Sequence, residues 1–184
     1  MKIDPLHAVE AVVSSIVNLY DCKLEIETYE GIRIFNENPT KYDNLAEELS
    51  DEGFDVKKNF DPTWDRCYVF SINHDDVQYG LMISFTGGLA YLYEIQADGI
   101  FRSISCTNST TVAERKIMKI LDSWSLMLLS EAILGIKIPA GSDWTSRKFA
   151  TVFHTLFRDC GDYLPWSRES LDAVMPPDWK PPRP

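Results

Sequence analysis

The chain has 184 residues, of which 45% are hydrophobic and 25% are charged, and its formal net charge is −10 at pH 7. This length suits one domain with a proper hydrophobic core, and this composition excludes a disordered chain. No apolar run approaches the roughly 20 residues that a membrane-spanning helix needs. An acidic chain also repels nucleic acid and anionic lipid, so neither is expected as a partner.

The negative charge is concentrated in the first third of the chain. Residues 1–65 contain 15 acidic and 6 basic side chains, a net charge of −9, whereas residues 66–184 contain 13 and 12, a net charge of −1. A surface of this kind attracts basic partners, although acidic surfaces also simply keep proteins in solution.

The N-terminal sequence and the cysteines favour a cytoplasmic location. The opening residues, MKIDPLHAVEAVVSS, lack the uninterrupted apolar segment of a signal peptide. Four cysteines stand far apart in the sequence, without a CxxC pair, so we expect reduced and mostly packed thiols; two disulfides remain an alternative. These cysteines are Cys22, Cys67, Cys106 and Cys160.

The first third is predicted to contain two helices and several short strands. Asp4-Pro5 begins a helix that continues to Tyr20, with apolar residues at steps of three and four. Alternating residues then predict a strand over Lys23–Thr28 and a short partner strand over Ile32–Phe35. A surface helix follows over Thr40–Glu52.

That helix has a narrow buried stripe formed by Tyr42, Leu45 and Leu49, and Gly53 is expected to end it. Phe54–Phe60 is predicted to form a strand, and Asp61–Asp65 a loop.

The middle of the chain predicts an antiparallel meander. Its separators are short and rich in Asn, Asp and Gly, and such turns force neighbouring strands to run antiparallel. One side of the second strand, from Val77 to Phe85, is expected to face the core, with Tyr91 and Tyr93 in phase on the next strand. The predicted strands are Cys67–Ile72, Val77–Phe85, Leu89–Gln96 and Ile100–Ser105.

The last third is predicted to be helical. Thr111–Glu114 is a capping box that opens a long helix to about Leu134, and Asp143 caps another whose apolar stripe ends at Phe157. Residues 176–184 include five prolines and cannot form a helix or a sheet. The sequence therefore predicts one α+β domain over residues 1–175, an antiparallel meander packed by N-terminal and C-terminal helices, followed by a proline-rich tail over 176–184.

No catalytic, metal or cofactor site is predicted. The chain lacks GxGxxG, GxxxxGK[ST], GxSxG and HExxH motifs. His7, His74 and His154 each stand in a context that a structural role explains better than catalysis does. His74 adjoins Asp75 and Asp76, but three adjacent turn residues rarely converge on one metal ion. We therefore expect that the chain is not an enzyme.

The segment from Asp43 to Asp55 contains six acidic residues and no basic one. On a helix several of them form like-charge pairs four residues apart, each of which costs a few tenths of a kcal/mol. Aromatic residues stand at both helix ends and beside the following acids, an arrangement typical of a protein interface. The predicted partner-binding residues are Tyr42, Asp43, Glu47, Glu48, Asp51, Glu52, Asp55, Asp61, Trp64 and Asp65.

A compact acidic α+β chain with a meander, no catalytic motif and this acidic segment resembles the bacterial immunity proteins that neutralise toxins in the producing cell. The resemblance concerns the general character of the whole chain and matches no motif. It implies a monomer or weak dimer that binds a basic toxin domain, in the first place a nuclease, and blocks the toxin's active-site surface.

Two alternatives remain open. One is an acidic secretion chaperone or adaptor, which predicts a stable dimer with an exposed hydrophobic groove. The other is an enzyme or small-ligand-binding protein with a sheet-lined pocket built from Tyr79, Tyr91 and Tyr93.

Overall fold

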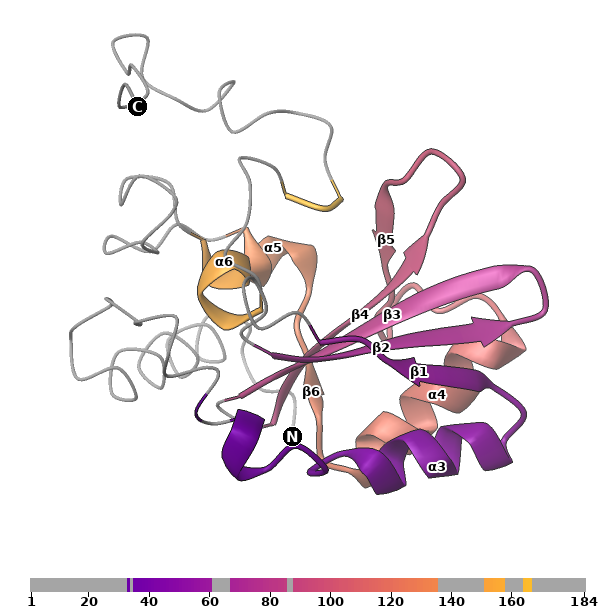
Figure 1. Cartoon of the computed structure of the whole chain (residues 1–184). Helices are drawn as coiled ribbons and strands as arrows, with labels where there is room; N and C mark the ends of the chain where they lie inside the picture. Colours follow the sequence, from indigo (N-terminus) through magenta and orange to yellow (C-terminus); the bar gives the residue numbers. More distant parts are fainter. Residues whose placement is uncertain are drawn as a thin grey trace, which may run out of the picture.

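The computed structural model describes residues 33, 35–60, 67–85, 88–135, 151–157 and 164–166. These residues form an α+β fold around a mostly antiparallel sheet, as the sequence predicts (Figure 1). The elements are α3 (Asp43–Asp51), β1 (Asp55–Lys58), β2 (Cys67–His74), β3 (Val77–Ser84), β4 (Leu89–Ile95), β5 (Phe101–Ser103), α4 (Val112–Ser123), β6 (Met127–Leu128), α5 (Glu131–Leu134) and α6 (Val152–Leu156).

Three predicted features lie outside the described residues: the helix over 4–20, the strand over 23–28 and the tail over 176–184. The loop over 61–65 also lies outside them.

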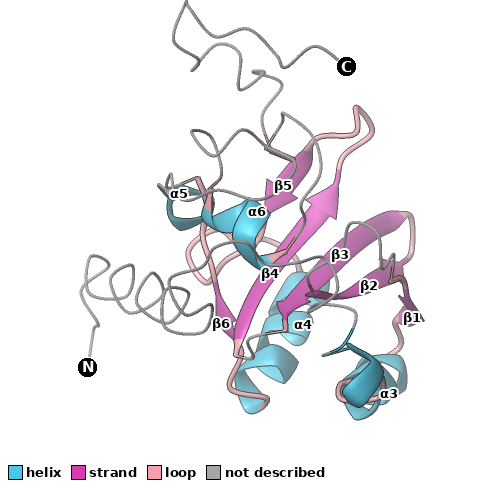
Figure 2. Ribbon diagram, turned by 60° about the vertical axis from the view of Figure 1, so that its left-hand side comes forward, coloured by secondary structure: helices cyan, strands magenta, loops and turns pink. Residues whose placement is uncertain are grey.

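The sheet is the predicted meander, in the order β1–β2–β3–β4–β5 with every neighbouring pair antiparallel. The tight turns use left-handed backbone at Asp75 (φ 52°) and Gly99 (φ 80°), a conformation that Asp tolerates and Gly adopts freely. A sixth strand, β6, pairs with β4 in parallel beside its first residues, Leu89 and Ala90. Figure 2 shows β1 and β6 on opposite sides of the sheet.

Both faces of the sheet are buried, whereas the sequence indicated one core face along β3. Tyr79, Leu81 and Ile83 pack in a first core with α3 and α4. Met82, between Leu81 and Ile83 and so out of phase with them, packs on the opposite face in a second core with α6. Met82 pairs with Tyr91 across β3 and β4. The second core includes Met82, Tyr91, Tyr93, Val152, Phe153, Leu156 and Phe157.

The predicted strand at Ile32–Phe35 is wrong where the structure describes it. Arg33 and Phe35–Glu37 are helical. Arg33 and Glu37 form an ion pair four residues apart, and the Asn38 amide donates to the Phe35 carbonyl at 3.1 Å, which closes the turn. Phe35 stacks on Phe60 with 3.8 Å between the ring centroids. Both rings pack against the first core, and this packing favours the helical turn over a strand.

The predicted helix from Thr111 to about Leu134 is also interrupted. α4 ends at Ser123, and Ser125 takes a left-handed conformation (φ 54°) that turns the chain back. The amides of Met127 and Leu129 then donate to the Gly88 and Ala90 carbonyls at 2.7 and 2.8 Å. These hydrogen bonds satisfy backbone carbonyl groups at the edge of β4. Their contribution outweighs the preference of this segment for a helix.

The capping box that opens α4 gives a first prediction. The Glu114 amide donates to Thr111 Oγ1 at 3.1 Å, and the Thr111 amide donates to Glu114 Oε2 at 3.2 Å. Thr111→Ala should lower the free energy of unfolding by about 1 kcal/mol, because one helix-terminal amide loses its acceptor. Urea denaturation measures this change. Thr111→Ser keeps the hydroxyl and should retain most of the stability; equal losses in both variants would contradict the capping role.

Candidate functional site

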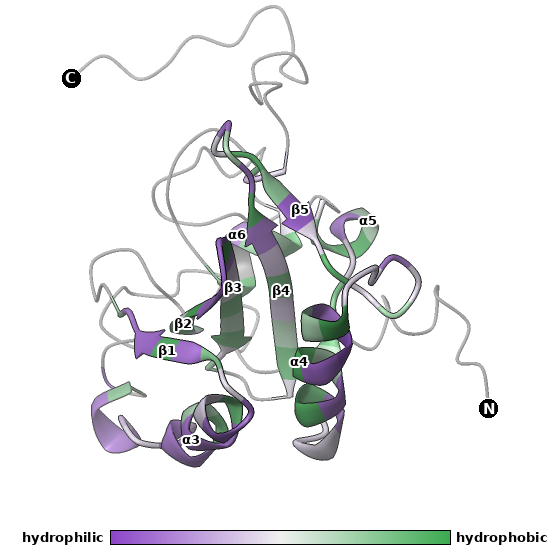
Figure 3. Cartoon of the chain, turned by 90° about the vertical axis from the view of Figure 1, so that its right-hand side faces the viewer, coloured by the Kyte–Doolittle hydropathy of each residue, from purple (hydrophilic) through white to green (hydrophobic). Residues whose placement is uncertain are grey.

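The acidic segment forms the outer side of α3. Leu45 and Leu49 are buried in the first core and fix the helix against the sheet. The opposite side consequently faces solvent, and Figure 3 shows this helix largely in hydrophilic colours. Four carboxylates are exposed there and define the acidic face of α3: Glu47, Glu48, Asp51 and Glu52.

Several of the predicted carboxylates already have partners within the chain. Asp43 forms an ion pair with Lys58, Glu52 with Lys116 at 3.0 Å, and Asp55 with Lys57 at 3.4 Å. The expectation of a wholly uncompensated negative band is therefore wrong. Lysines that follow the segment in sequence, and one from α4, come within reach only when the chain folds.

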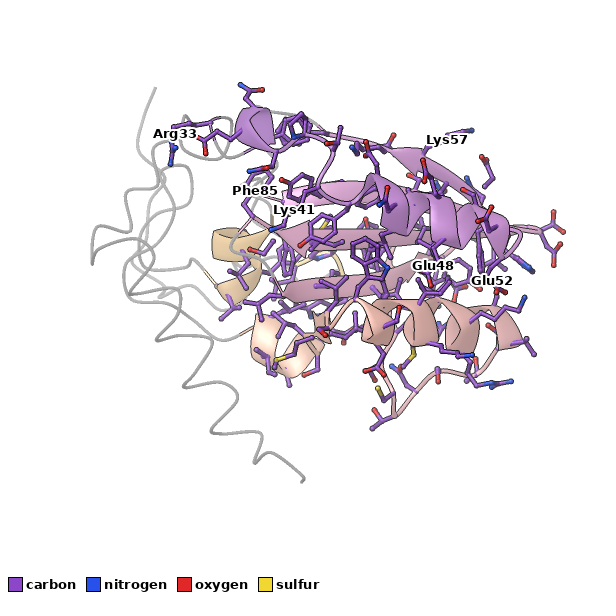
Figure 4. The ribbon with its side chains drawn as sticks, turned by 90° about the horizontal axis from the view of Figure 1, so that it is seen from below. Arg33, Lys41, Glu48, Glu52, Lys57 and Phe85 are labelled. Atoms are coloured by element: carbon purple, nitrogen blue, oxygen red, sulfur yellow. The ribbon has the colours of Figure 1, made fainter. Side chains whose placement is uncertain are left out.

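Glu48 has a different partner. Its Oε2 accepts a hydrogen bond from Trp124 Nε1 at 2.8 Å, across the junction of α3 with the end of α4. Figure 4 shows Glu48 and Glu52 on the side of α3 that faces α4, while Lys57 lies on β1, away from that junction.

Glu47 and Asp51 are the carboxylates that remain uncompensated. Both are exposed, and within the described part of the chain neither has a basic side chain within ion-pair distance. They stand four residues apart on one helix face, where like charges repel. A cationic partner would relieve this repulsion.

A shallow hollow of about 250 Å³ separates α3 from α4. Glu48 and Glu52 line one side, and Lys116 and Lys119 line the other. The acidic face is thus bordered by positive charge, so its negative potential is directed outward, toward Glu47 and Asp51, rather than toward α4.

The aromatic rim predicted for this surface is absent where the structure describes it. Tyr42 is 5% exposed and Phe54 is 4% exposed, and both belong to the first core. The Tyr42 ring packs edge-on against Tyr68 with 5.0 Å between centroids, and burial raises the pKa of its hydroxyl. Tyr42 is therefore unavailable to a partner. Asp61, Trp64 and Asp65 lie outside the described residues.

Sequence reasoning missed the contribution of α4 to this surface. Lys116 and Lys119 could be recognised as one basic helix face, but nothing in the sequence paired that face with α3. Trp124 follows the last residue of α4, and its ring packs against the first core. The indole N–H of a packed tryptophan usually needs a hydrogen-bond acceptor. This requirement was the one signal in the sequence that Trp124 has a polar partner nearby.

The tyrosines proposed for a shared sheet-lined pocket do not come together. Tyr79 lies in the first core, whereas Tyr91 and Tyr93 lie on the other face of the sheet in the second. The Tyr91 hydroxyl is buried without a well-formed hydrogen bond among the described residues, although the Ser103 side chain lies beside it. Burial and the nearby Glu131 carboxylate raise the pKa of Tyr91, so it stays protonated.

Two of the three histidines lie in the described part of the chain. His74 Nδ1 lies 3.3 Å from Asp75 and its ring packs on Phe54, at 5.0 Å between centroids. His154 is fully buried in α6, and its Nδ1 lies 2.8 Å from Thr151 Oγ1. Among the residues described, no three His, Cys, Asp or Glu side chains gather as a metal site.

Among the described residues, a partly buried charge network joins β4, β5 and α4. The Arg102 guanidinium on β5 contacts the carboxylates of Glu94 on β4 and Glu114 on α4. Burial raises the pKa of Glu114, but hydrogen bonds from the Thr110 and Thr111 amides and from Arg102 outweigh it, so the net pKa is lowered. This network ties α4 to the sheet, which is a structural role.

Comparison with known proteins adds no relative: no protein-family model, curated protein or solved structure matches the chain. No helix among the residues that the structure describes has the length and apolar character to cross a membrane.

Proposed function

We propose that the chain is a protein-binding inhibitor of the immunity type, which neutralises a basic partner by covering that partner's cationic surface. The observation that carries the proposal is the solvent-facing pair Glu47 and Asp51 on a helix held rigidly by Leu45 and Leu49. A helix that is already folded presents its charges without a cost for ordering its backbone on binding. We further propose a nuclease toxin as the partner, because its substrate-binding surface must be cationic.

The internal ion pairs narrow the proposed surface without removing it. Asp55 and Glu52 are exposed in their pairs with Lys57 and Lys116. Exposed pairs of this kind contribute at most about 1 kcal/mol, so a partner's arginine or lysine can replace them. The proposed contact is therefore centred on Glu47 and Asp51, with Glu48 and Glu52 at its border.

Charge reversal at the centre tests the proposal. The purified chain is immobilised at low ionic strength and exposed to a lysate of the organism that encodes it, and association with the captured protein is then followed by surface plasmon resonance. Glu47→Lys/Asp51→Lys should slow association about tenfold at low salt, because electrostatic steering contributes on this scale. The difference should shrink as salt is added.

Asp75→Lys/Asp76→Lys is the matched control. It changes the net charge by the same amount at the exposed β2–β3 turn, outside the acidic face of α3, although His74 of this turn packs on Phe54 just after that helix. We expect this variant to associate at close to the rate of the unmodified chain. Equal slowing in both variants would show that only total charge matters, and no slowing in the α3 variant would contradict the acidic-face mechanism.

A further inference from the structure

Among the residues that the structure describes, the outer edge of β6 has backbone amides without a backbone partner. The Met127 and Leu129 amides donate to β4, so these two residues face the sheet. Successive residues of a strand direct their amides to opposite sides, so the N–H groups of Leu128 and Ser130 point away from β4. Within the residues described, neither of these two amides donates to a backbone carbonyl. The edge therefore offers two outward amides to an added strand, whereas the Ser130 carbonyl already accepts from the Ile133 and Leu134 amides.

An apolar cleft of about 420 Å³ lies along this edge. The loop after β5 forms one wall, the C-terminal half of α4 forms the floor, and β6 forms the other wall. Met127, at the mouth, is 45% exposed, which is unusual for a side chain of its size and polarity. The lining includes Cys106, Thr107, Met118, Leu121, Met127 and Leu128.

One charged side chain lines the same cleft. Asp122 is exposed at the end of α4, and among the described residues no basic side chain lies within ion-pair distance of it. Its carboxylate gives an otherwise apolar cleft a preference for a ligand that carries both an apolar group and a positive charge.

We propose that this cleft binds an extended peptide segment of a partner protein, which adds to the outer edge of β6 as a strand. The outward amides of Leu128 and Ser130 bond the peptide backbone, the cleft takes one apolar side chain, and Asp122 pairs with a lysine or arginine of the peptide. A strand is favoured over a helix or a small molecule because an extended backbone can bond the outward amides of Leu128 and Ser130 together. The proposal is independent of the acidic face of α3.

Amide hydrogen exchange on the full chain tests this assignment. One probe is a five-residue peptide with an N-terminal lysine followed by alternating valine and threonine. The other has the reversed sequence, so that one of the two can place its lysine at Asp122 whichever direction the added strand runs. At least one should slow exchange of the Leu128 and Ser130 amides tenfold or more. The Met127 and Leu129 amides, already bonded to β4, serve as internal controls and should be unchanged. If neither peptide slows exchange at Leu128 and Ser130, the proposal is wrong.

Ser130 offers a matched pair of variants for the backbone contact. Its φ of −83° is close to the value that proline imposes, and its amide makes no bond to β4. Ser130→Pro removes the outward amide donor and the hydroxyl, whereas Ser130→Ala removes the hydroxyl alone. Peptide affinity should fall about fivefold in Ser130→Pro and stay unchanged in Ser130→Ala. Equal affinities in the two variants would exclude strand addition here.

The charged contact is tested separately. Asp122→Asn should weaken binding of the lysine peptide about threefold at low salt, whereas Asp76→Asn, at the distant β2–β3 turn, should not. Self-association is the competing occupant: concentration-dependent protection of the Leu128 amide without any peptide, together with a dimer in light scattering, would overturn the proposal.

Discussion

Arg102→Leu should lower the free energy of unfolding at pH 7 by about 3 kcal/mol, because it leaves a charged Glu114 buried without its cation. Glu114 is 0% exposed, and Arg102 is the only guanidinium that reaches it within the described residues. Arg102 also donates through Nε to Glu94 at 2.8 Å, so the substitution breaks the links from β5 to both β4 and α4. Arg102 and Glu94 retain some contact with solvent. The expected loss of unfolding free energy therefore lies near the lower end of the range of about 3–5 kcal/mol for breaking a buried ion pair.

The effect of Arg102→Leu should depend on pH. In the unmodified chain the pKa of Glu114 lies below its ordinary value of 4.5, so its ionisation stabilises the fold above pH 4.5, and this contribution is lost as the pH falls through the lowered pKa. Without Arg102 the burial effect is opposed by the Thr110 and Thr111 donors alone among the described residues, so the pKa of Glu114 should rise. A protonated Glu114 needs no cation, and the stability difference between the variant and the unmodified chain should therefore shrink toward acid pH.

Urea denaturation at pH 7 and pH 4 measures both parts of this prediction. The double variant Arg102→Leu/Glu114→Gln is the control, because a neutral amide at position 114 can still accept hydrogen bonds from the Thr110 and Thr111 amides. It should be more stable than Arg102→Leu at pH 7. A double variant that is less stable than the single one would show that Glu114 is not the residue left unpaired.

The strands of the sheet could be predicted from the sequence because their signals are local. Alternating apolar residues defined β3 and β4, and the turn residues at Asp75 and Gly99 fixed their direction. The number of buried faces could not be predicted in the same way. Met82 and Tyr91 are buried only because α6 covers the second face, and its residues come from a distant part of the chain.

The break after α4 shows where local signals fail. Residues up to Leu134 keep a helical pattern, and nothing nearby marks Ser125 as a reversal point. The decisive interactions are the hydrogen bonds from Met127 and Leu129 to β4, which exist only once the sheet has formed. Tertiary hydrogen bonding therefore overrides helix propensity in this segment.

The candidate site could be predicted only in part, because local patterns do not show which other elements supply its partners. The periodicity of α3 correctly placed Leu45 and Leu49 inside and the acidic residues outside. The charge balance depended on partners from other elements, above all Lys116 and Trp124 of the α4 region, which meet α3 only in the folded chain. A run of like charges in a sequence thus indicates where counter-charges are needed, not that they are missing.

Gly80→Ala is expected to lower the free energy of unfolding by about 2 kcal/mol, although alanine normally suits a strand better than glycine does. Gly80 pairs with Tyr93 across β3 and β4, and the tyrosine ring lies over the glycine. A Cβ at position 80 would lie 2.1 Å from Cζ of Tyr93. The ring cannot easily move away, because it is stacked on Phe101 at 4.1 Å and on Tyr91 at 5.1 Å between centroids.

A double-mutant cycle separates this clash from other effects of the substitution. In a Tyr93→Val background the ring is gone, and Gly80→Ala should then be neutral or stabilising by up to about 1 kcal/mol, because alanine restricts the unfolded chain more than glycine does. Thermal and urea unfolding of the four proteins give the coupling energy. The same loss in both backgrounds would mean that the backbone of β3, and not the ring of Tyr93, requires glycine at position 80. A change of sign would show that the Tyr93 ring is what excludes a side chain at position 80.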